Sequence, residues 1–164
     1  MNQLKGESIL LVKVKPGEVQ RAVRDLMRNE EITEVDTVLG SYDIVASGAF
    51  EDHRSLRNFV ERVESKPFCQ GCYARPSFEF WKRKKEEDSQ GAVWSLIRSS
   101  NPSRTLKELK KLTNIRKLIR TTGDYNIVAN FSIRSQDEWN RTVFERIHTI
   151  TGVQSTITLP SLFD

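Results

Sequence analysis

The residues best suited to chemistry stand in two glycine turns, Gly40–Asp43 and Gly123–Asn126. Both have the order glycine, a small or acidic residue, tyrosine, then Asp or Asn. Free backbone N–H groups around such a glycine can take a carboxylate, and the side chain of Asp124 can take an ammonium group. The same residues also suit a purely structural turn, because glycine permits positive φ and Asp and Asn can bond their own backbone in the turn. The turns therefore predict either a site for an amino acid or a pair of structural corners.

The remaining reactive side chains do not form a catalytic pattern. Cys69 and Cys72 have the CxxC spacing of zinc and redox sites, but a tetrahedral site needs further ligands and the sequence has no second CxxC. His53 and His148 have no neighbouring nucleophile or carboxylate constellation, and there is no phosphate-binding glycine loop. We therefore expect no catalytic residues, no metal, no cofactor and no enzymatic activity.

The turns belong to an internal repeat, which is the strongest feature of the sequence. Gly40–Ala46 reappears as Gly123–Ala129, an offset of 123 − 40 = 83. After one extra residue in the second copy the offset becomes 84, so that Glu61–Val63 matches Glu145–Ile147. We expect a first repeat over residues 1–81, a charged linker over 82–91 and a second repeat over 92–164.

Hydrophobic periodicity predicts the order βαββαβ in each copy. In the first copy the strands are expected at Ile9–Val14, Ile32–Leu39, Ile44–Phe50 and Cys72–Phe80, with helices from Glu18 and around Leu56–Val63. In the second they are expected at Val93–Arg98, Arg116–Thr121, Ile127–Ile133 and Gln154–Leu159, with helices around Leu106–Leu112 and Trp139–Ile147. The fold class is therefore α+β, with two ferredoxin-like repeats.

The third strand of each copy is uncharged on both faces; in the first copy, Val45, Ser47 and Ala49 alternate with neighbours that also carry no charge. Two helices can cover one face of a four-stranded sheet. The other face needs a cover, and the tethered second copy is the nearest candidate. We expect the two sheets to pack face to face as a pseudo-dimer.

The composition is that of an ordinary globular protein, with 37% hydrophobic and 29% charged residues. No stretch approaches the roughly 18 apolar residues of a membrane span, and we expect a cytoplasmic location without membrane contact. The net charge is +4. Up to Arg83 there are 13 basic and 13 acidic residues, which leaves 26 − 13 = 13 basic and 22 − 13 = 9 acidic residues in the second half. The surplus is concentrated in Lys107, Lys110, Lys111, Arg116, Lys117 and Arg120.

The second copy resembles the ligand-binding (RAM) domain of the Lrp/AsnC family of leucine-responsive regulators. The resemblance rests on Thr122–Asn126 and on the closing segment Gly152–Leu159, and more loosely on Gly40–Asp43 in the first copy. It implies amino acids or similar small effectors, bound at interfaces near the turns. The implied ligand-binding residues are Gly40, Ser41, Tyr42, Asp43, Thr122, Gly123, Asp124, Tyr125, Asn126, Ser155 and Thr156.

Two departures from the family pattern shape the expected function. Only about eight residues precede the first strand, which leaves no room for the family's helix-turn-helix. Each turn keeps one carboxylate of the family's pair, Asp43 in the first and Asp124 in the second. We therefore expect an effector-binding regulatory module that acts on transcription through protein partners, such as DNA-binding Lrp/AsnC relatives, and that can form homo-oligomers.

Two alternatives remain open at this point. The same scaffold type carries haem-pathway decarboxylases, so an enzyme is one alternative. The basic residues of the second copy suggest weak nucleic-acid binding as the other, because phosphate contacts by surface Lys and Arg are salt-sensitive and carry no sequence preference. We expect no sequence-specific DNA binding by this chain alone.

Overall fold

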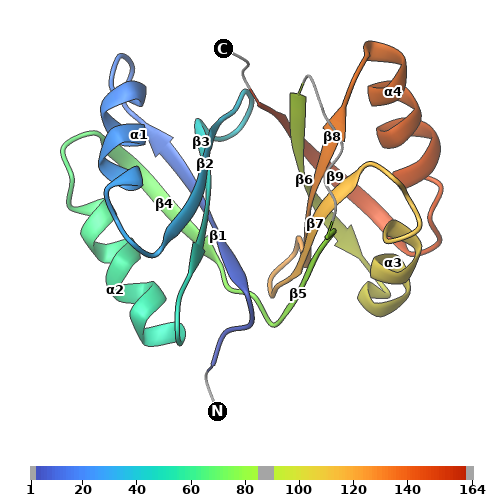
Figure 1. Cartoon of the computed structure of the whole chain (residues 1–164), viewed down its shortest axis with the longest axis horizontal. Helices are drawn as coiled ribbons and strands as arrows, with labels where there is room; N and C mark the ends of the chain where they lie inside the picture. The colour runs from blue at the N-terminus through green and yellow to red at the C-terminus, as the bar shows by residue number, and fades with distance from the viewer. Residues whose placement is uncertain (1–2, 85–90, 162–164) are drawn as a thin grey trace. The chain divides into compact units, whose positions relative to one another are not determined.

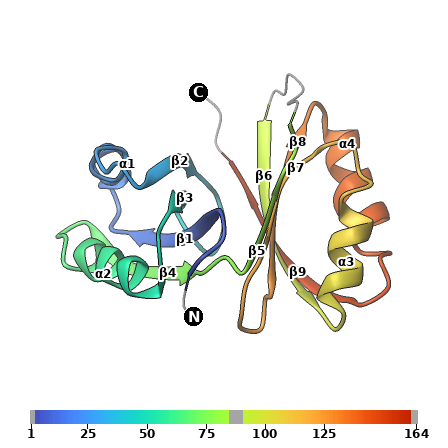
Figure 2. The same cartoon turned by 60° about the horizontal axis from the view of Figure 1, so that its bottom comes forward.

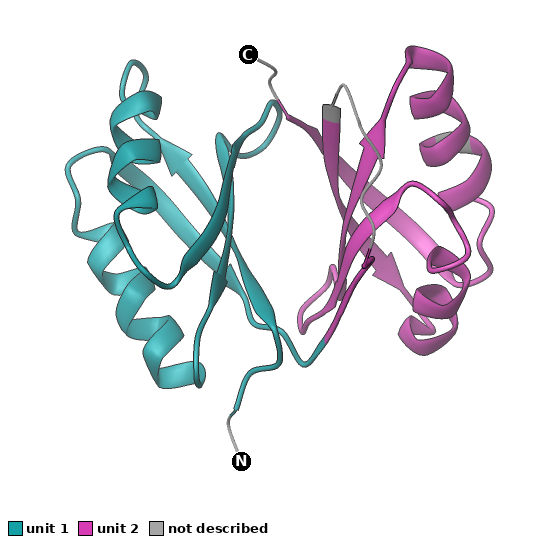
Figure 3. Ribbon diagram, in the orientation of Figure 1, with its two compact units in different colours: residues 1–79 teal, residues 80–164 magenta. Residues whose placement is uncertain are grey.

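The computed structural model describes residues 3–84 and 91–161, and the chain divides into two compact units, residues 1–79 and 80–164 (Figure 3). Each unit is an antiparallel sheet with two helical segments interleaved between its strands. The predicted α+β class with two ferredoxin-like repeats is confirmed. In the described parts of the chain, no helix is long and apolar enough to cross a membrane.

The first unit follows the predicted order βαββαβ (Figure 1). Its elements are β1 (Glu7–Val14), α1 (Val19–Met27), β2 (Ile32–Thr37), β3 (Ile44–Ala49), α2 (His53–Glu64) and β4 (Cys69–Arg75). The sheet order is β2-β3-β1-β4, with every pairing antiparallel. Both helices lie on one face of this sheet (Figure 2).

The second unit repeats this order with one strand added at an edge. Its elements are β5 (Glu79–Lys82), β6 (Gly91–Ser99), α3 (Pro102–Leu109), β7 (Ile115–Arg120), β8 (Ile127–Ile133), α4 (Gln136–Asn140), η1 (Arg141–Ile147) and β9 (Val153–Pro160). The sheet order is β5-β7-β8-β6-β9. Without β5, this order is the same as that of the first sheet.

Local capping signals mark where α2 and α3 begin. The Asp52 carboxylate caps α2 by accepting a hydrogen bond from the Ser55 N–H at 2.8 Å. The hydrogen bonds that the Ser55 N–H and hydroxyl donate to this carboxylate lower the pKa of Asp52, because they favour its charged form. Asn101 caps α3 in the same way, and Pro102 occupies the first turn, where a missing N–H is harmless.

Each unit has its own hydrophobic core between helices and sheet. The first is built around Leu10, Val12, Leu26, Ile44, Ala46, Leu56, Phe59 and Val63. The second is built around Val93, Ile97, Leu109, Ile115, Ile127, Ala129, Phe131, Val143 and Ile147. These residues come from the stripes that the hydrophobic periodicity predicted.

The second face of each sheet also holds buried residues, and on the third strands β3 and β8 it carries no charge, as predicted. It is not wholly apolar, since Ser47 and Asn130 lie on it, as does the buried Lys117 of β7, which is opposite Asn130. Ile9, Leu11 and Val45 in the first unit are fully buried, as are Trp94 and Val128 in the second. The expectation that the two sheets pack on each other stays a prediction.

The segment after β4 differs from the prediction. The expected single strand Cys72–Phe80 is broken, because β4 ends at Arg75 just before Pro76, and β5 joins the second sheet. The expected linker 82–91 is also shorter at its start: Lys82 lies in β5, and the Arg83 N–H donates to the Arg116 carbonyl at 2.9 Å. Residues 85–90 lie outside the described residues.

The extra residue of the second repeat is absorbed inside its second helical segment. The caps Asp52 and Ser135 still match at the offset of 83, whereas Val63 and Ile147 match at 84. Between these points α2 is a regular α-helix, but η1 is a π-helix, in which the hydrogen bonds span one residue more. One inserted residue thus widens the helix while Val143 and Ile147 remain in the core.

Candidate functional site

The turn of the second unit, Thr122–Asn126, connects β7 to β8. Gly123 has φ of +100°, the left-handed region that favours glycine, and a Cβ there would meet no atom within 4 Å. The positive φ, and not a lack of space for a side chain, therefore explains why residue 123 is a glycine. Gly40 has φ of +117° in the equivalent turn. The prediction that these glycines permit a positive φ is therefore confirmed in both turns.

Arg98 at the end of β6 joins this turn to the sheet. Its guanidinium lies over the Tyr125 ring, 5.2 Å from the centroid, and its Nη2 is 3.8 Å from the Asp124 Oδ2. The side chains of Arg98 and Asp124 are 43% and 87% exposed, so solvent reaches both charges. Ser155 on β9 donates to the Tyr125 hydroxyl at 3.4 Å. The structure thus brings Asp124, Tyr125 and Ser155 together, with Arg98 as an added cation.

The first turn has a weaker version of the same arrangement. Lys13 takes the place of Arg98, with its ammonium 5.8 Å from the centroid of the Tyr42 ring. Tyr42 also meets Tyr73 edge to face, with ring centroids 5.9 Å apart. Ser41 is exposed at the position of Asp124, so this turn has no matching exposed carboxylate.

The last residue of each turn is tied to the sheet. The Asp43 Oδ2 accepts from the Val14 N–H at 2.8 Å. Asn126 uses both ends of its amide, because its Oδ1 accepts from the Ser99 N–H at 3.0 Å and its Nδ2 donates to the Ser99 carbonyl at 2.9 Å. Val14 and Ser99 stand at the irregularities that end β1 and β6. Both side chains therefore support the backbone across the sheet.

Two of the predicted residues do not join the cluster. Thr156 lies on the other face of β9 from Ser155, and its hydroxyl hydrogen-bonds the His148 Nε2 at 2.8 Å. Thr122 is exposed at the start of the turn.

The basic residues of the second half do not form one surface. Lys107, Lys110 and Lys111 are exposed on or just after α3. Lys117 on β7 is buried, while Arg116 donates to the Asn130 Oδ1 and Arg120 to the Ser103 hydroxyl. The cluster seen in the sequence is therefore divided between a helix and a strand.

The CxxC pair lies at the start of β4. Burial raises the pKa of the Cys69 thiol, and the more deeply buried Cys72 has a pKa of about 12. In the described ranges, no group of three or more His, Cys, Asp or Glu side chains is arranged to hold a metal ion.

These thiols are expected to react slowly with iodoacetamide at pH 8. Because the thiolate is the nucleophile, raising a pKa from 9.0 to about 12 lowers the thiolate population of Cys72 by roughly a thousandfold. Mass spectrometry should find Cys69 labelled before Cys72, and both labelled quickly in urea. Rapid native labelling of Cys72 in a Cys69→Ser variant would contradict this expectation.

Sequence reasoning missed Arg98 and Lys13. A signal for them exists, because each is the first cation after the aliphatic residues of the first strand in its repeat, on the same face as alternate apolar residues such as Leu96 and Leu11. The sequence alone gives no reason for a cation at these two positions, because the contacts with Tyr42 and Tyr125 appear only in the structure.

The fold defines the class of protein, a tandem pair of ferredoxin-like α+β domains, and comparison with known proteins identifies the family. The model of the Lrp/AsnC ligand binding domain matches residues 7–86 and again 96–162. The chain belongs to this family, with two copies of the domain. The predicted resemblance is thus confirmed. A search of curated proteins found no match.

Three solved structures resemble the chain. The siroheme decarboxylase NirDL has a TM-score of 0.69 at 8% identity, over 95% of this chain and 71% of that one. A putative monooxygenase from Fusobacterium nucleatum subsp. nucleatum has a TM-score of 0.56 at 11% identity, over 99% and 94%. AsnC from E. coli has a TM-score of 0.43 at 26% identity, and its match covers 50% of this chain and 61% of that one.

The prediction that excluded an enzyme is wrong. It rested on the lack of a catalytic pattern in the sequence, yet NirDL is an enzyme whose fold matches 95% of this chain. At 8% identity the likeness shows the fold alone. The fold therefore gives no ground for excluding catalysis.

Proposed function

We propose that the chain is an effector-binding module whose second turn recognises a small zwitterion, an amino acid in type. The observation that supports this most strongly is the exposed set of Arg98, Asp124 and Tyr125. It offers one cation and one anion beside an aromatic ring, in a family named for ligand binding.

The chemistry of the set matches both charges of an amino acid. The Arg98 guanidinium can take a carboxylate through two parallel N–H donors, and Asp124 can accept from an ammonium group. The existing contact between them is 3.8 Å long and exposed, so it contributes little to stability and a ligand can displace it. Tyr125, fixed by Ser155, offers a ring against which the body of the ligand can pack.

The first turn is proposed to bind the same ligand weakly or not at all. Lys13 has no planar guanidinium, Ser41 cannot balance an ammonium group, and Asp43 supports Val14. The two copies would then have divided their tasks, with the binding role in the second.

Ligand occupancy is proposed to act through protein partners. The family membership supports regulation of this kind, with DNA-binding Lrp/AsnC relatives or further copies of this chain as the partners.

The test is binding of the twenty amino acids, one at a time, by thermal shift and then calorimetry. Arg98→Gln and Asp124→Asn should each weaken the strongest binder by about tenfold or more, since each removes a charge-assisted hydrogen bond. The matched variant Lys13→Gln should leave the affinity within twofold. Equal losses in Lys13→Gln, or an unchanged affinity in Arg98→Gln, would contradict the proposed site.

A further inference from the structure

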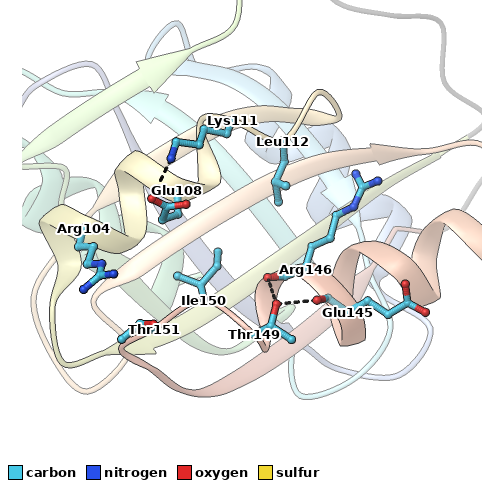
Figure 4. A pocket seen from close by; sticks show the side chains of 9 residues that line it. All are labelled: Arg104, Glu108, Lys111, Leu112, Glu145, Arg146, Thr149, Ile150 and Thr151. Carbon is cyan, nitrogen blue, oxygen red and sulfur yellow. Dashed lines mark hydrogen bonds and ion pairs between the residues drawn. The ribbon is translucent and has the colours of Figure 1, made fainter.

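Each unit has a cleft between its two helical segments, away from the turns. The cleft of the second unit lies between α3 and the end of η1 and has a volume of about 450 Å³ (Figure 4). The matching cleft of the first unit, between α1 and α2, measures about 220 Å³. Sites for small organic ligands usually have volumes of about 300–1,000 Å³, so only the second cleft is large enough.

The two clefts are equivalent parts of the repeat. The lining residues Arg146 and Thr149 of the second correspond to Arg62 and Ser65 of the first at the offset of 84. The helix that forms one wall differs between them, since α2 is regular and η1 is the π-helix. π-helical turns often mark functional sites, and here the widened helix accompanies the larger cleft.

The ion pairs of the two clefts also differ. In the first unit Lys66 pairs with Asp25 at 3.6 Å and Arg62 with Glu31 at 4.0 Å. In the second unit Lys111 pairs with Glu108 at 3.0 Å.

Two cations of the second cleft remain available. Within residues 3–84 and 91–161, neither Arg104 nor Arg146 forms an ion pair, and both are exposed. Figure 4 shows the Glu145 carboxylate directed away from Ile150, so it does not neutralise the centre of the cleft. Two guanidinium groups are therefore free to bind an anion.

The floor of the cleft is apolar. Leu112 and Ile150 are half-buried and pack against the second core. In the view of Figure 4 they lie between Arg104 and Arg146. A cation at the rim and aliphatic carbon at the floor suit a ligand with an anionic group on an apolar body.

We propose that this cleft, between α3 and η1, binds a small carboxylic acid with an apolar body, at a site separate from the Arg98 turn. The carboxylate accepts hydrogen bonds from Arg104 or Arg146, and the apolar body covers Leu112 and Ile150. The proposal does not depend on the amino-acid site at the turn, because it uses none of the same residues.

The test uses the full chain and phenylacetate as the probe, with binding mapped by amide chemical shifts. The expected shifts cluster at Leu112 and Ile150. Arg104→Gln and Arg146→Gln are compared, and the variant that removes the arginine holding the carboxylate should bind phenylacetate about tenfold more weakly. Their matched variants in the first repeat, Arg21→Gln and Arg62→Gln, should change the affinity less than twofold.

Two further ligands separate the possible causes of binding. The uncharged analogue 2-phenylethanol should bind at least tenfold more weakly than phenylacetate, and inorganic phosphate should not compete with it. Equal binding of the alcohol, full competition by phosphate, or shifts confined to residues near Arg98 would each overturn the proposal. Arg98→Gln should leave phenylacetate binding unchanged, which separates this site from the turn.

Deleting Arg141 tests the role of the π-helix independently. The deletion restores the spacing of the first repeat, with Val143 moved to the position of Phe59, so η1 should become a regular helix. Phenylacetate affinity should fall by about tenfold as the cleft narrows. An unchanged affinity in a folded deletion variant would overturn the role of the π-helix, while the arginine variants still test the site.

Discussion

Replacing Phe59 by alanine is expected to destabilise the first unit by about 3–5 kcal/mol. The Phe59 side chain is 1% exposed, its ring centroid lies 5.2 Å from that of Phe50, and the Arg62 guanidinium lies over the ring, 5.2 Å from its centroid. Removing the ring leaves a cavity that the rigid helix α2 and its sheet cannot close. Urea unfolding followed by circular dichroism should show the loss as a lower midpoint.

The repeat supplies a matched control for this change. Val143 occupies the equivalent core position in the second unit, and Val143→Ala removes only two methyl groups, at about 1.5 kcal/mol. All three tryptophans, Trp81, Trp94 and Trp139, belong to the second unit. Their fluorescence should therefore report the unfolding of the second unit and show the effect of Val143→Ala on its midpoint. A midpoint unchanged by Phe59→Ala would contradict the central place of this ring in the core.

Asn126→Ala is expected to cost about 1–3 kcal/mol, although it changes an apparent ligand residue. The Asn126 amide bonds both the N–H and the carbonyl of Ser99, as a neighbouring strand would. Truncation leaves both backbone groups unpaired in a half-buried place. Asp124→Ala should cost less than about 0.5 kcal/mol, because its side chain is 87% exposed and its ion pair with Arg98 is long, at 3.8 Å.

The equivalent residue Asp43 gives the control. Asp43→Asn keeps an oxygen that can accept from the Val14 N–H and should be nearly neutral, whereas Asp43→Ala should destabilise the first unit. The denaturation midpoint of each variant is the measurement. If Asp124→Ala proved as destabilising as Asn126→Ala, the division of the turn into an exposed ligand group and a structural group would be wrong.

The sequence was sufficient for the repeat, the element order and the core, and less so for the site. Hydrophobic periodicity places Leu26, Phe59 and Ile147 correctly, because burial of one face leaves a regular trace in the chain. The turn motif contains Asp124 and Tyr125 of the proposed site, but it also contains Asp43 and Asn126, whose polar groups hydrogen-bond the backbone of Val14 and Ser99. Motif spacing cannot separate these roles, since the partners Val14 and Ser99 are distant in the chain.

Two other features depended on three-dimensional pairing. The charged residues around Lys82 indicated a linker, yet β5 finds its partner in β7. The one-residue insertion was visible as a change of offset, but its outcome as a π-helix depends on keeping Val143 and Ile147 in the core.

The position of β5 has a consequence for solubility. β5 covers the outer edge of β7, a strand that carries Ile115, Leu118 and Ile119. An uncovered edge of this kind is a template for pairing with other chains and hence for aggregation. A four-residue strand with Glu79 and Lys82 at its ends is a poor template itself. A fragment that starts after residue 84 would lack β5 and leave the edge of β7 uncovered. A fragment that starts before Glu79 would keep β5 and should associate with itself less.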